Sequence, residues 1–229
     1  MNSFALRHCT NFNIRFTIEF NRGATSKYLA GKISPTSKTI TLNNQIYKVF
    51  DCEQYKNKNN EIIVDGTPHS EYKEVIRFET YYCKDKNLLI LNTAIGDART
   101  FLKYLEIDQE QNINLSKINF QFNIITKQPG VLMDQIWFNT IDKHAKTKSF
   151  NGVEVNKNRE AKEAINNQKA TYIKVQMDVA SNNKTTARTV GFSKKSGIVL
   201  VQKNDANIDS SEKELQLLLD TFETYKRFK

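Results

Sequence analysis

Proline and glycine are scarce in this sequence: its 229 residues include only three prolines and eight glycines. So few turn formers argue against collagen-like, linker-rich and many-turned barrel architectures. Long apolar runs are absent too, because the longest, NLLILNTAI and GIVLVQ, are the size of single strands and fall short of the roughly 18 residues of a membrane-spanning helix. The N-terminus lacks the basic head, apolar middle and cleavage site of a secretory signal. We therefore expect a cytoplasmic protein that does not enter membranes.

Cysteine and histidine are rare, with three of each. Cys9, Cys52 and Cys83 are an odd number without a close pair, which predicts buried or partly buried thiols and no disulfide framework. The histidines share no ligand spacing with one another or with a cysteine, so zinc is not expected. Glycine-rich phosphate loops and the Gly-x-Ser-x-Gly elbow are also missing. These absences remove the main support for nucleotide or serine hydrolysis, and we expect no cofactor.

Positive charge is what the sequence has in excess, and it is concentrated in one segment. The net charge is +9, and residues 143–203 account for all of it, because they contain thirteen Lys or Arg and four Asp or Glu. Such clustering suits a polyanion-binding surface, because each Lys that neutralises a phosphate releases condensed counterions. The alternative is a merely solvated face, since Lys also keeps proteins soluble.

The stretch 182–203 carries five basic residues and no acidic one, and its alternation predicts a strand hairpin. Its turn, SKKSG, is predicted to present Lys194 and Lys195 at a mobile tip, where they can follow a phosphate backbone. Because Lys outnumbers Arg, which reads guanine edges, backbone contact is favoured over sequence readout. The alternative is an ordinary hairpin whose lysines protect a sheet edge from aggregation.

The charge pattern therefore favours a protein that binds nucleic acid without being an enzyme. We expect DNA as the partner, with weak sequence preference, and leave a homodimer open; a mobile-element or phage-defence setting is the context we associate with it. The residues predicted to contact nucleic acid are Lys143, Lys146, Lys148, Lys184, Arg188, Lys194 and Lys195.

Local patterns in the first half predict hairpins and one helix. Alternation predicts a half-buried strand over residues 11–20. Residues 38–50 predict a hairpin around Asn43-Asn44, because Asn tolerates the positive φ of tight turns. A polar loop over residues 54–61 and a second hairpin over residues 71–91 follow. A helix capped by Asp97 comes next. Its apolar stripe is formed by Ala98, Phe101, Leu102 and Leu105.

The second half again begins with an alternating segment, which predicts a strand over residues 118–124. A helix is predicted from Val131, with Leu132, Ile136, Trp137 and Ile141 on one buried face and the cations of residues 142–148 at its C-terminus. A short helix over residues 158–167 and a cleanly alternating strand over 171–180 complete the pattern before the hairpin.

The last segment predicts a C-terminal amphipathic helix, because Ser211 and Glu214 form a capping box ahead of an apolar stripe that begins at Leu215. Strands and helices come in irregular groups, which favours an α+β fold: antiparallel sheets built from hairpins and meanders, with helices packed on one face. A polar break at residues 108–114 suggests domains 1–110 and 111–229, with a single domain as the alternative.

One short pattern suggests a nuclease instead. His144, Lys146 and Asn151 have the spacing used by phospholipase-D-like phosphodiesterases, in which a His attacks phosphorus and a Lys stabilises the oxyanion. Asn151 stands where that family has Asp, and no second copy of the pattern occurs. A cation pair at a helix end is the simpler interpretation.

A second pattern, Asp65 followed by Glu71 and Lys73, resembles the carboxylates and Lys of metal-dependent restriction-type nucleases. The spacing is short for that fold, and a turn with Gly66 and Pro68 explains the segment more simply.

A third class of function remains beside nucleic-acid binding and nuclease activity: a protein-interaction module that binds an acidic partner.

Overall fold

The computed structural model describes residues 2–23, 26, 28–181, 184–201 and 211–228. In these ranges antiparallel sheet dominates, accompanied by four α-helices, which confirms the predicted α+β class. The chain divides into two compact units: unit 1 is Met1–Leu6 with Lys117–Lys229, and unit 2 is Arg7–Ser116. Strand β1 (Asn2–Phe12) begins in unit 1 and continues in unit 2. Whether residues 1–110 and 111–229 act as separate domains remains a prediction.

Unit 1 is built on an antiparallel sheet with the order β11–β10–β12–β13–β14–β1. The hairpin of β12 and β13 is paired from Tyr172 opposite Ser193 to Ser181 opposite Lys184. The predicted alternation of β12 is confirmed, because all four apolar positions from Ile173 to Val179 are buried. The strands that lie wholly in this unit are β10 (Leu132–Asn139), β11 (Thr147–Asn151), β12 (Ala170–Ser181), β13 (Lys184–Ser193) and β14 (Gly197–Val201).

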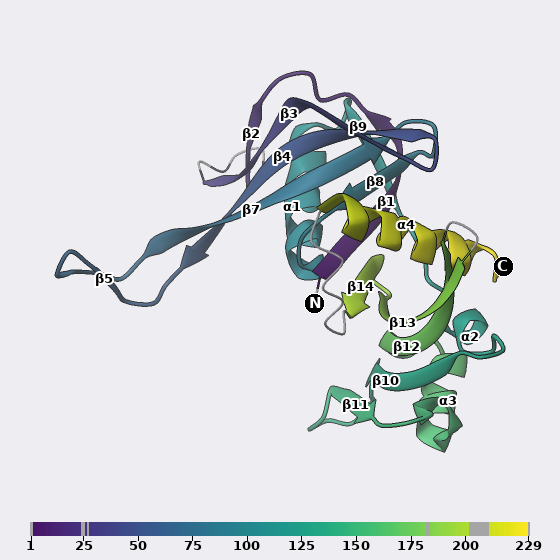
Figure 1. The fold of residues 1–229 in the computed structure, drawn as a ribbon. Coiled ribbons are helices and arrows are strands. Elements are labelled where there is room, and N and C mark those ends of the chain that lie inside the picture. The colour runs from purple at the N-terminus through teal and green to yellow at the C-terminus, as the bar shows by residue number, and fades with distance from the viewer. Residues whose placement is uncertain (1, 24–25, 27, 182–183, 202–210, 229) are drawn as a thin grey trace. The chain divides into compact units, whose positions relative to one another are not determined.

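The helices of unit 1 contribute an aromatic cluster to its core. The Tyr225 ring lies 5.0 Å from Phe120 and 6.0 Å from Phe192, centroid to centroid. Its hydroxyl donates to the carbonyl of Asn119 at 3.0 Å and accepts from the amide of Gln121 at 3.2 Å, so it fixes the segment before α2. Figure 1 labels the helices α2 (Phe122–Ile125), α3 (Arg159–Asn166) and α4 (Ser211–Lys226); the 3-10 turn η1 (Val155–Lys157) precedes α3.

In unit 2 the strands follow the order β1–β8–β7–β4–β3–β2, with β9 paired to β1. The core centres on Phe101 of α1 (Ile95–Asp108), which meets Phe20 and Phe78 edge-on at 5.0 Å and 5.1 Å. The predicted turn at Asn43 and Asn44 is confirmed, with φ of 51° and 58°. The strands are β2 (Ile18–Asn21), β3 (Leu29–Leu42), β4 (Gln45–Lys58), β5 (Ile62–Val64), β6 (Thr67–His69), β7 (Tyr72–Cys83), β8 (Leu88–Leu91) and β9 (Ile113–Lys117).

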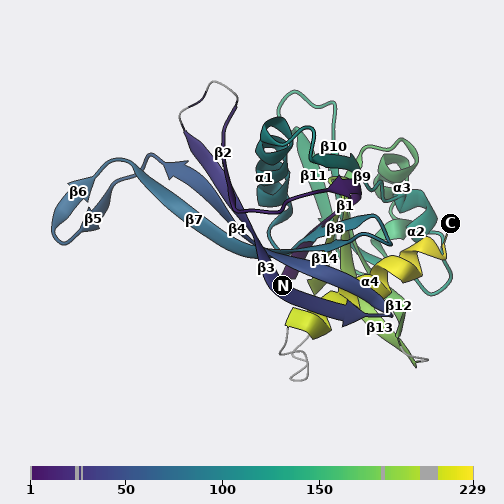
Figure 2. The same ribbon diagram turned by 90° about the horizontal axis from the view of Figure 1, so that it is seen from above.

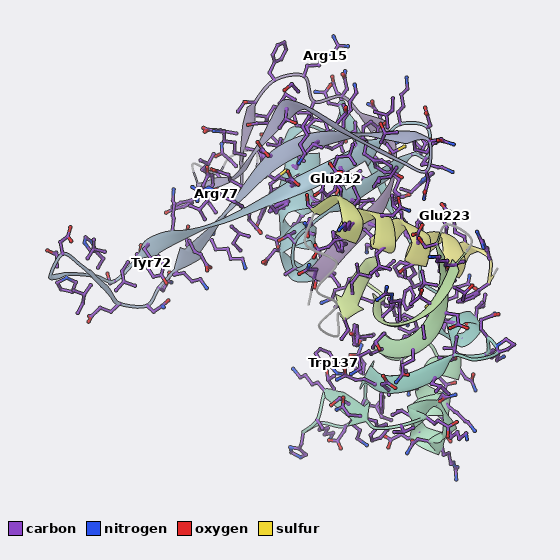
Figure 3. The ribbon with its side chains drawn as sticks, in the orientation of Figure 1. Arg15, Tyr72, Arg77, Trp137, Glu212 and Glu223 are labelled. Atoms are coloured by element: carbon purple, nitrogen blue, oxygen red, sulfur yellow. The ribbon has the colours of Figure 1, made fainter. Side chains whose placement is uncertain are left out.

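A two-stranded ribbon extends from the sheet of unit 2, and we call residues 56–74 the arm. β4 and β7 stay paired as far as Lys58 opposite Tyr72, and the small β5–β6 hairpin forms the tip. Figure 2 shows the ribbon, and Figure 3 marks Tyr72 on it. The tip turns at Asp65 and Gly66, whose φ values of 49° and 79° suit the tight turn of a hairpin.

The predicted helix from Val131 is wrong, because this segment is strand β10. The buried residues are Met133, Ile136 and Phe138, and a register shift at Asp134 inserts one extra residue between the first two. A bulge therefore gives apolar residues three positions apart, which imitates helical spacing. Trp137, expected in the core, is 47% exposed.

Three other predictions also fail, two of them in part. Residues 118–124 were expected to be a strand, but none of them is: β9 ends at Lys117, and helix α2 begins at Phe122, with its buried residues Phe122 and Ile125 three apart. The first predicted strand is interrupted, since β1 ends at Phe12 and β2 begins at Ile18, leaving Phe16 78% exposed. The polar loop at residues 54–61 is β4 as far as Lys58.

Helix boundaries follow local signals in one case and not in others. α3 is confirmed, and the side chain of Asn158 caps it by accepting from the amide of Ala161 at 3.1 Å. α1 buries its predicted stripe but is preceded by Ala94, so Asp97 lies in the first turn instead of capping it. α4 begins at Ser211, and the residue before it lies outside the described ranges, so the predicted capping box stays a prediction.

Candidate nucleic-acid interface

Three connections of unit 1 meet at the same end of its sheet. Asn139 at the end of β10 is opposite Thr147, Phe138 is opposite Ala170 at the start of β12, and Ser193 is opposite Gly197. The intervening segments 140–146, 167–169 and 194–196 therefore lie at neighbouring positions. We call this region the lysine-rich end. Its lysines are Lys143, Lys146, Lys169, Lys194 and Lys195.

The first connection, residues 140–146, is held by hydrogen bonds that leave its lysines exposed. A carboxylate oxygen of Asp142 accepts from the backbone amides of His144 at 2.7 Å and Ala145 at 3.2 Å, as Asp does in tight turns. The amide of Thr140 donates to the carbonyl of Lys146 at 3.0 Å. Lys143 and Lys146 are both exposed on this ordered loop.

The second connection ends α3 with a left-handed residue. Gln168 has a φ of 55°, and the amide of Lys169 donates to the carbonyl of Ala164 at 2.8 Å. This six-to-one bond is the Schellman arrangement, which satisfies carbonyls at a helix end. It sets Lys169 at the surface immediately before β12.

The third connection is the predicted turn, in which Ser196 has a φ of 62°. Lys194 and Lys195 are exposed as expected. Lys194 was expected to be mobile, but its ammonium group donates to the carbonyl of Gln168 and its amide to that of Thr171 at 3.0 Å. Partial burial lowers the pKa of Lys194.

The other predicted cations are not part of this end. Lys148 on β11 forms an ion pair with Glu160 at 2.8 Å, and this hydrogen bond raises the pKa of Lys148. Lys184 begins β13, so it lies about 30 Å along the strand from Ser193, at roughly 3.3 Å per residue. Arg188 lies between them, half-buried and opposite Met177. The structure thus brings together Lys143, Lys146, Lys194 and Lys195 but leaves the other three apart.

Lys169 was not among the predicted contacts, although the predicted helix over residues 158–167 and the predicted strand over residues 171–180 place this lysine in the connection between them. Within the described ranges, Lys143, Lys146 and Lys169 form no ion pair. Their charges are therefore available to an anion. Ammonium groups on exposed loops bind phosphate as point charges, without the planar geometry that Arg requires.

A cavity of about 540 Å³ opens beside Lys194. The rings of Phe120 and Phe122, both buried, form part of its wall, and the hydroxyl of Tyr225 fixes the segment that carries them. Amide side chains supply both donors and acceptors there, so the cavity can bind a polar, uncharged group next to a cation. The amides are Asn119, Gln121, Asn123, Asn166 and Gln168.

The two nuclease patterns are not assembled as those mechanisms require. Lys146 precedes β11 and Asn151 ends it, so they are separated by about 17 Å of extended chain, at roughly 3.3 Å per residue. The segment is a loop and a strand, so the predicted helix end is wrong. Asp65 and Glu71 are exposed on the arm, with Lys73 on β7. Among the residues the structure describes, no three His, Cys, Asp or Glu side chains gather as a metal site would need.

The thiols are buried, as expected. Burial raises the pKa of Cys9 and of Cys52 to about 12, so both are protonated at neutral pH.

In the described part of the chain, none of the helices has the length and apolar character needed to span a membrane. Comparison of the sequence with protein-family models and with curated proteins found no match.

Proposed function

We propose that this protein binds nucleic acid by contacting phosphates at the lysine-rich end of unit 1. The observation that carries the proposal is strand register, which brings three separate connections and five lysines to one end of a sheet. At least three of these lysines have no ion-pair partner among the described residues. A group of unneutralised cations favours a polyanion, because each phosphate contact releases counterions.

The proposed binding surface differs from the predicted one in three respects. It includes Lys169, it omits Lys184 and Arg188, which lie further along β13, and it gives Lys148 a smaller role because Glu160 already neutralises that side chain. DNA as the partner, weak sequence preference, a cytoplasmic location and a homodimer stay predictions. We further propose that helices cover one face of each sheet and that α4 is amphipathic, which its buried Leu215, Leu218 and Leu219 support.

The salt dependence of binding tests the proposal. We expect duplex DNA to bind at about 50 mM salt, with an affinity that falls steeply as salt rises. The triple variant Lys143→Ala/Lys146→Ala/Lys169→Ala should reduce the slope of log affinity against log salt by about 3, since each duplex phosphate contact contributes about 0.9.

A matched control removes the same charge from unit 2. Lys38, Lys56 and Lys58 are ion-paired with Glu79 at 3.1 Å, Asp97 at 2.7 Å and Glu74 at 3.2 Å. The triple Ala variant of these lysines should leave the slope nearly unchanged. Equal losses from both triples would show that only net charge matters, and absence of binding at low salt would refute the proposal.

A further inference from the structure

Two aromatic side chains lie side by side on the exposed face of the unit 1 sheet. Trp137 on β10 is directly opposite Tyr172 on β12. Their ring centroids are 5.5 Å apart and the rings are inclined by 51°. Trp137, labelled in Figure 3, lies at the surface with 47% of its side chain exposed, and Tyr172 is half-buried. Leaving the largest apolar side chain of the chain half in water sacrifices burial that would stabilise the fold, which calls for an explanation at this position.

The Tyr172 ring is seated on a glycine. A Cβ atom at Gly191 of β13 would lie 2.7 Å from two carbon atoms of the Tyr172 ring. Because only glycine leaves this space, the ring lies over the neighbouring strand. The result is a low aromatic surface that extends from β10 across β12 to β13.

The neighbours of this aromatic surface are polar, and most of them are uncharged. On the same face, Gln135 is opposite Lys174, and Ser149 is opposite Trp137. Asp134, at the bulge, is already held by the amide of Gln176 at 3.1 Å and 3.2 Å. An apolar protein partner would bury these polar groups without hydrogen bonds, which is costly. A partner that offers both ring faces and hydrogen-bonding groups avoids that cost.

The aromatic surface adjoins the lysine-rich end. Tyr172 is opposite Ser193, the residue before Lys194. Trp137 is two residues from Asn139, which is opposite Thr147, the residue after Lys146. A phosphate chain that follows these lysines therefore passes within a few residues of both rings.

We propose that Trp137 and Tyr172 form a stacking platform for the bases of single-stranded nucleic acid. The proposal rests on the proposed function, because the lysine-rich end supplies the backbone contacts. Bases in a duplex already stack on one another, so a ring on a flat sheet can only reach unpaired bases. Every base has a flat face, and the platform therefore has little sequence preference.

The experiment uses the fact that Trp137 is the only tryptophan of the chain. Its fluorescence reports stacking without a label. Oligothymidylate and oligouridylate of about 15 nucleotides, and a DNA duplex of the same length, are titrated into the 229-residue protein at about 50 mM salt. We expect both single strands to quench the fluorescence to saturation, and the duplex to bind, as measured by anisotropy of a labelled probe, without quenching.

Two variants locate the contact. Trp137→Leu should weaken single-strand binding about tenfold and leave duplex binding unchanged, since stacking of one base is lost. Gly191→Ala, which displaces the Tyr172 ring while retaining both aromatics, should weaken single-strand binding in the same sense. Circular dichroism and thermal unfolding check that each variant folds.

The possible results separate this inference from the proposed function. If neither single strand nor duplex binds, both are wrong. If both bind but fluorescence does not change and neither variant affects single strands, the platform is wrong and the phosphate-binding proposal stands. Quenching together with selective loss in both variants supports the platform.

Discussion

The sheet of unit 2 and the lysine-rich end of unit 1 differ in how far their basic side chains form ion pairs with carboxylates. In unit 2, cations lie across from carboxylates on neighbouring strands, as with Arg77 and Glu53 at 3.1 Å and Lys58 and Glu74 at 3.2 Å. At the lysine-rich end, Lys143, Lys146 and Lys169 have no such partner in the described ranges. Exposed ion pairs add little to stability, with a median of about 0–1 kcal/mol. Their main effect here is to neutralise the basic side chains of this sheet locally, whereas Lys143, Lys146 and Lys169 keep their charge.

The two units also differ in what lies above a strand glycine. Gly31 of unit 2 lies beneath the fully buried ring of Phe20, whereas Gly191 of unit 1 lies beneath the partly exposed ring of Tyr172. A closed core cannot adjust to an added methyl group, but an exposed ring can turn away. Comparing the stability of alanine variants at these two glycines therefore tests whether the face that carries Tyr172 can adjust to an added methyl group.

The largest expected effect is that of Gly31→Ala. Its Cβ would meet the backbone carbonyl of Glu53 and the ring of Phe20, both at 2.7 Å, and overpacking of this kind costs about 1–3 kcal/mol. Gly191→Ala should change stability by less than about 1 kcal/mol, because Tyr172 can move and Ala is less flexible than Gly in the unfolded chain. Urea denaturation measures both. Equal losses would show that the face carrying Tyr172 is as closed as the core of unit 2.

A smaller effect concerns a carboxylate whose pKa depends on pairing in unit 2. Burial acts to raise the pKa of Glu79, but hydrogen bonds from the Tyr81 hydroxyl at 2.6 Å and from Lys38 at 3.1 Å hold it below its usual value. The resulting stabilisation is present above the unfolded-state pKa and is lost as pH falls through the folded-state pKa. Tyr81→Phe should therefore cost about 0.5–1.5 kcal/mol at neutral pH.

The pH dependence separates this carboxylate from simple packing. Denaturation of the wild type and of Tyr81→Phe at neutral pH and at about pH 3 should give a difference that shrinks on acidification, because the charge-assisted part of the hydrogen bond disappears. A difference independent of pH would mean that the hydroxyl acts without Glu79.

The smallest effect is expected at the tip of the arm. Ile63 is 69% exposed, so Ile63→Ser should change the free energy of unfolding by no more than about 0.5 kcal/mol. Thermal unfolding checks this, with Ile136→Val in the closed core of unit 1 as a comparison expected to lose about 0.5–1.5 kcal/mol. A large loss at Ile63 would indicate that the tip is covered in solution.

Local signals predicted the elements that depend on them. The Asn43-Asn44 turn, the short helix α3 and the alternation of β12 were all predicted correctly, because each is decided by residues close in sequence. β10 was not, since a bulge at Asp134 gave a strand the spacing of a helix. Tertiary pairing with β11 and β12, which the sequence pattern does not reveal, decides that segment.

The candidate site was predicted only in pieces for the same reason. The turn that carries Lys194 and Lys195 follows from the hairpin pattern. Its proximity to Lys146 and Lys169 depends on strand register across segments far apart in sequence. Trp137 was assigned to the core because a lone Trp on an apparent helix stripe is usually buried, and the bulge turns it to the opposite face.

Strand β1 has a consequence for how the chain reaches its native state. Asn2 to Ala5 pair with Leu200 to Gly197 in unit 1, while the rest of β1 belongs to unit 2. Residues 7–116 can pair with one another early in synthesis, but Asn2 to Ala5 cannot pair with β14 until residues 197–200 have been made. Pairing between residues so far apart in sequence is slow, so we expect β1 and β14 to join late, and the edge of β14 to be open to other chains until then.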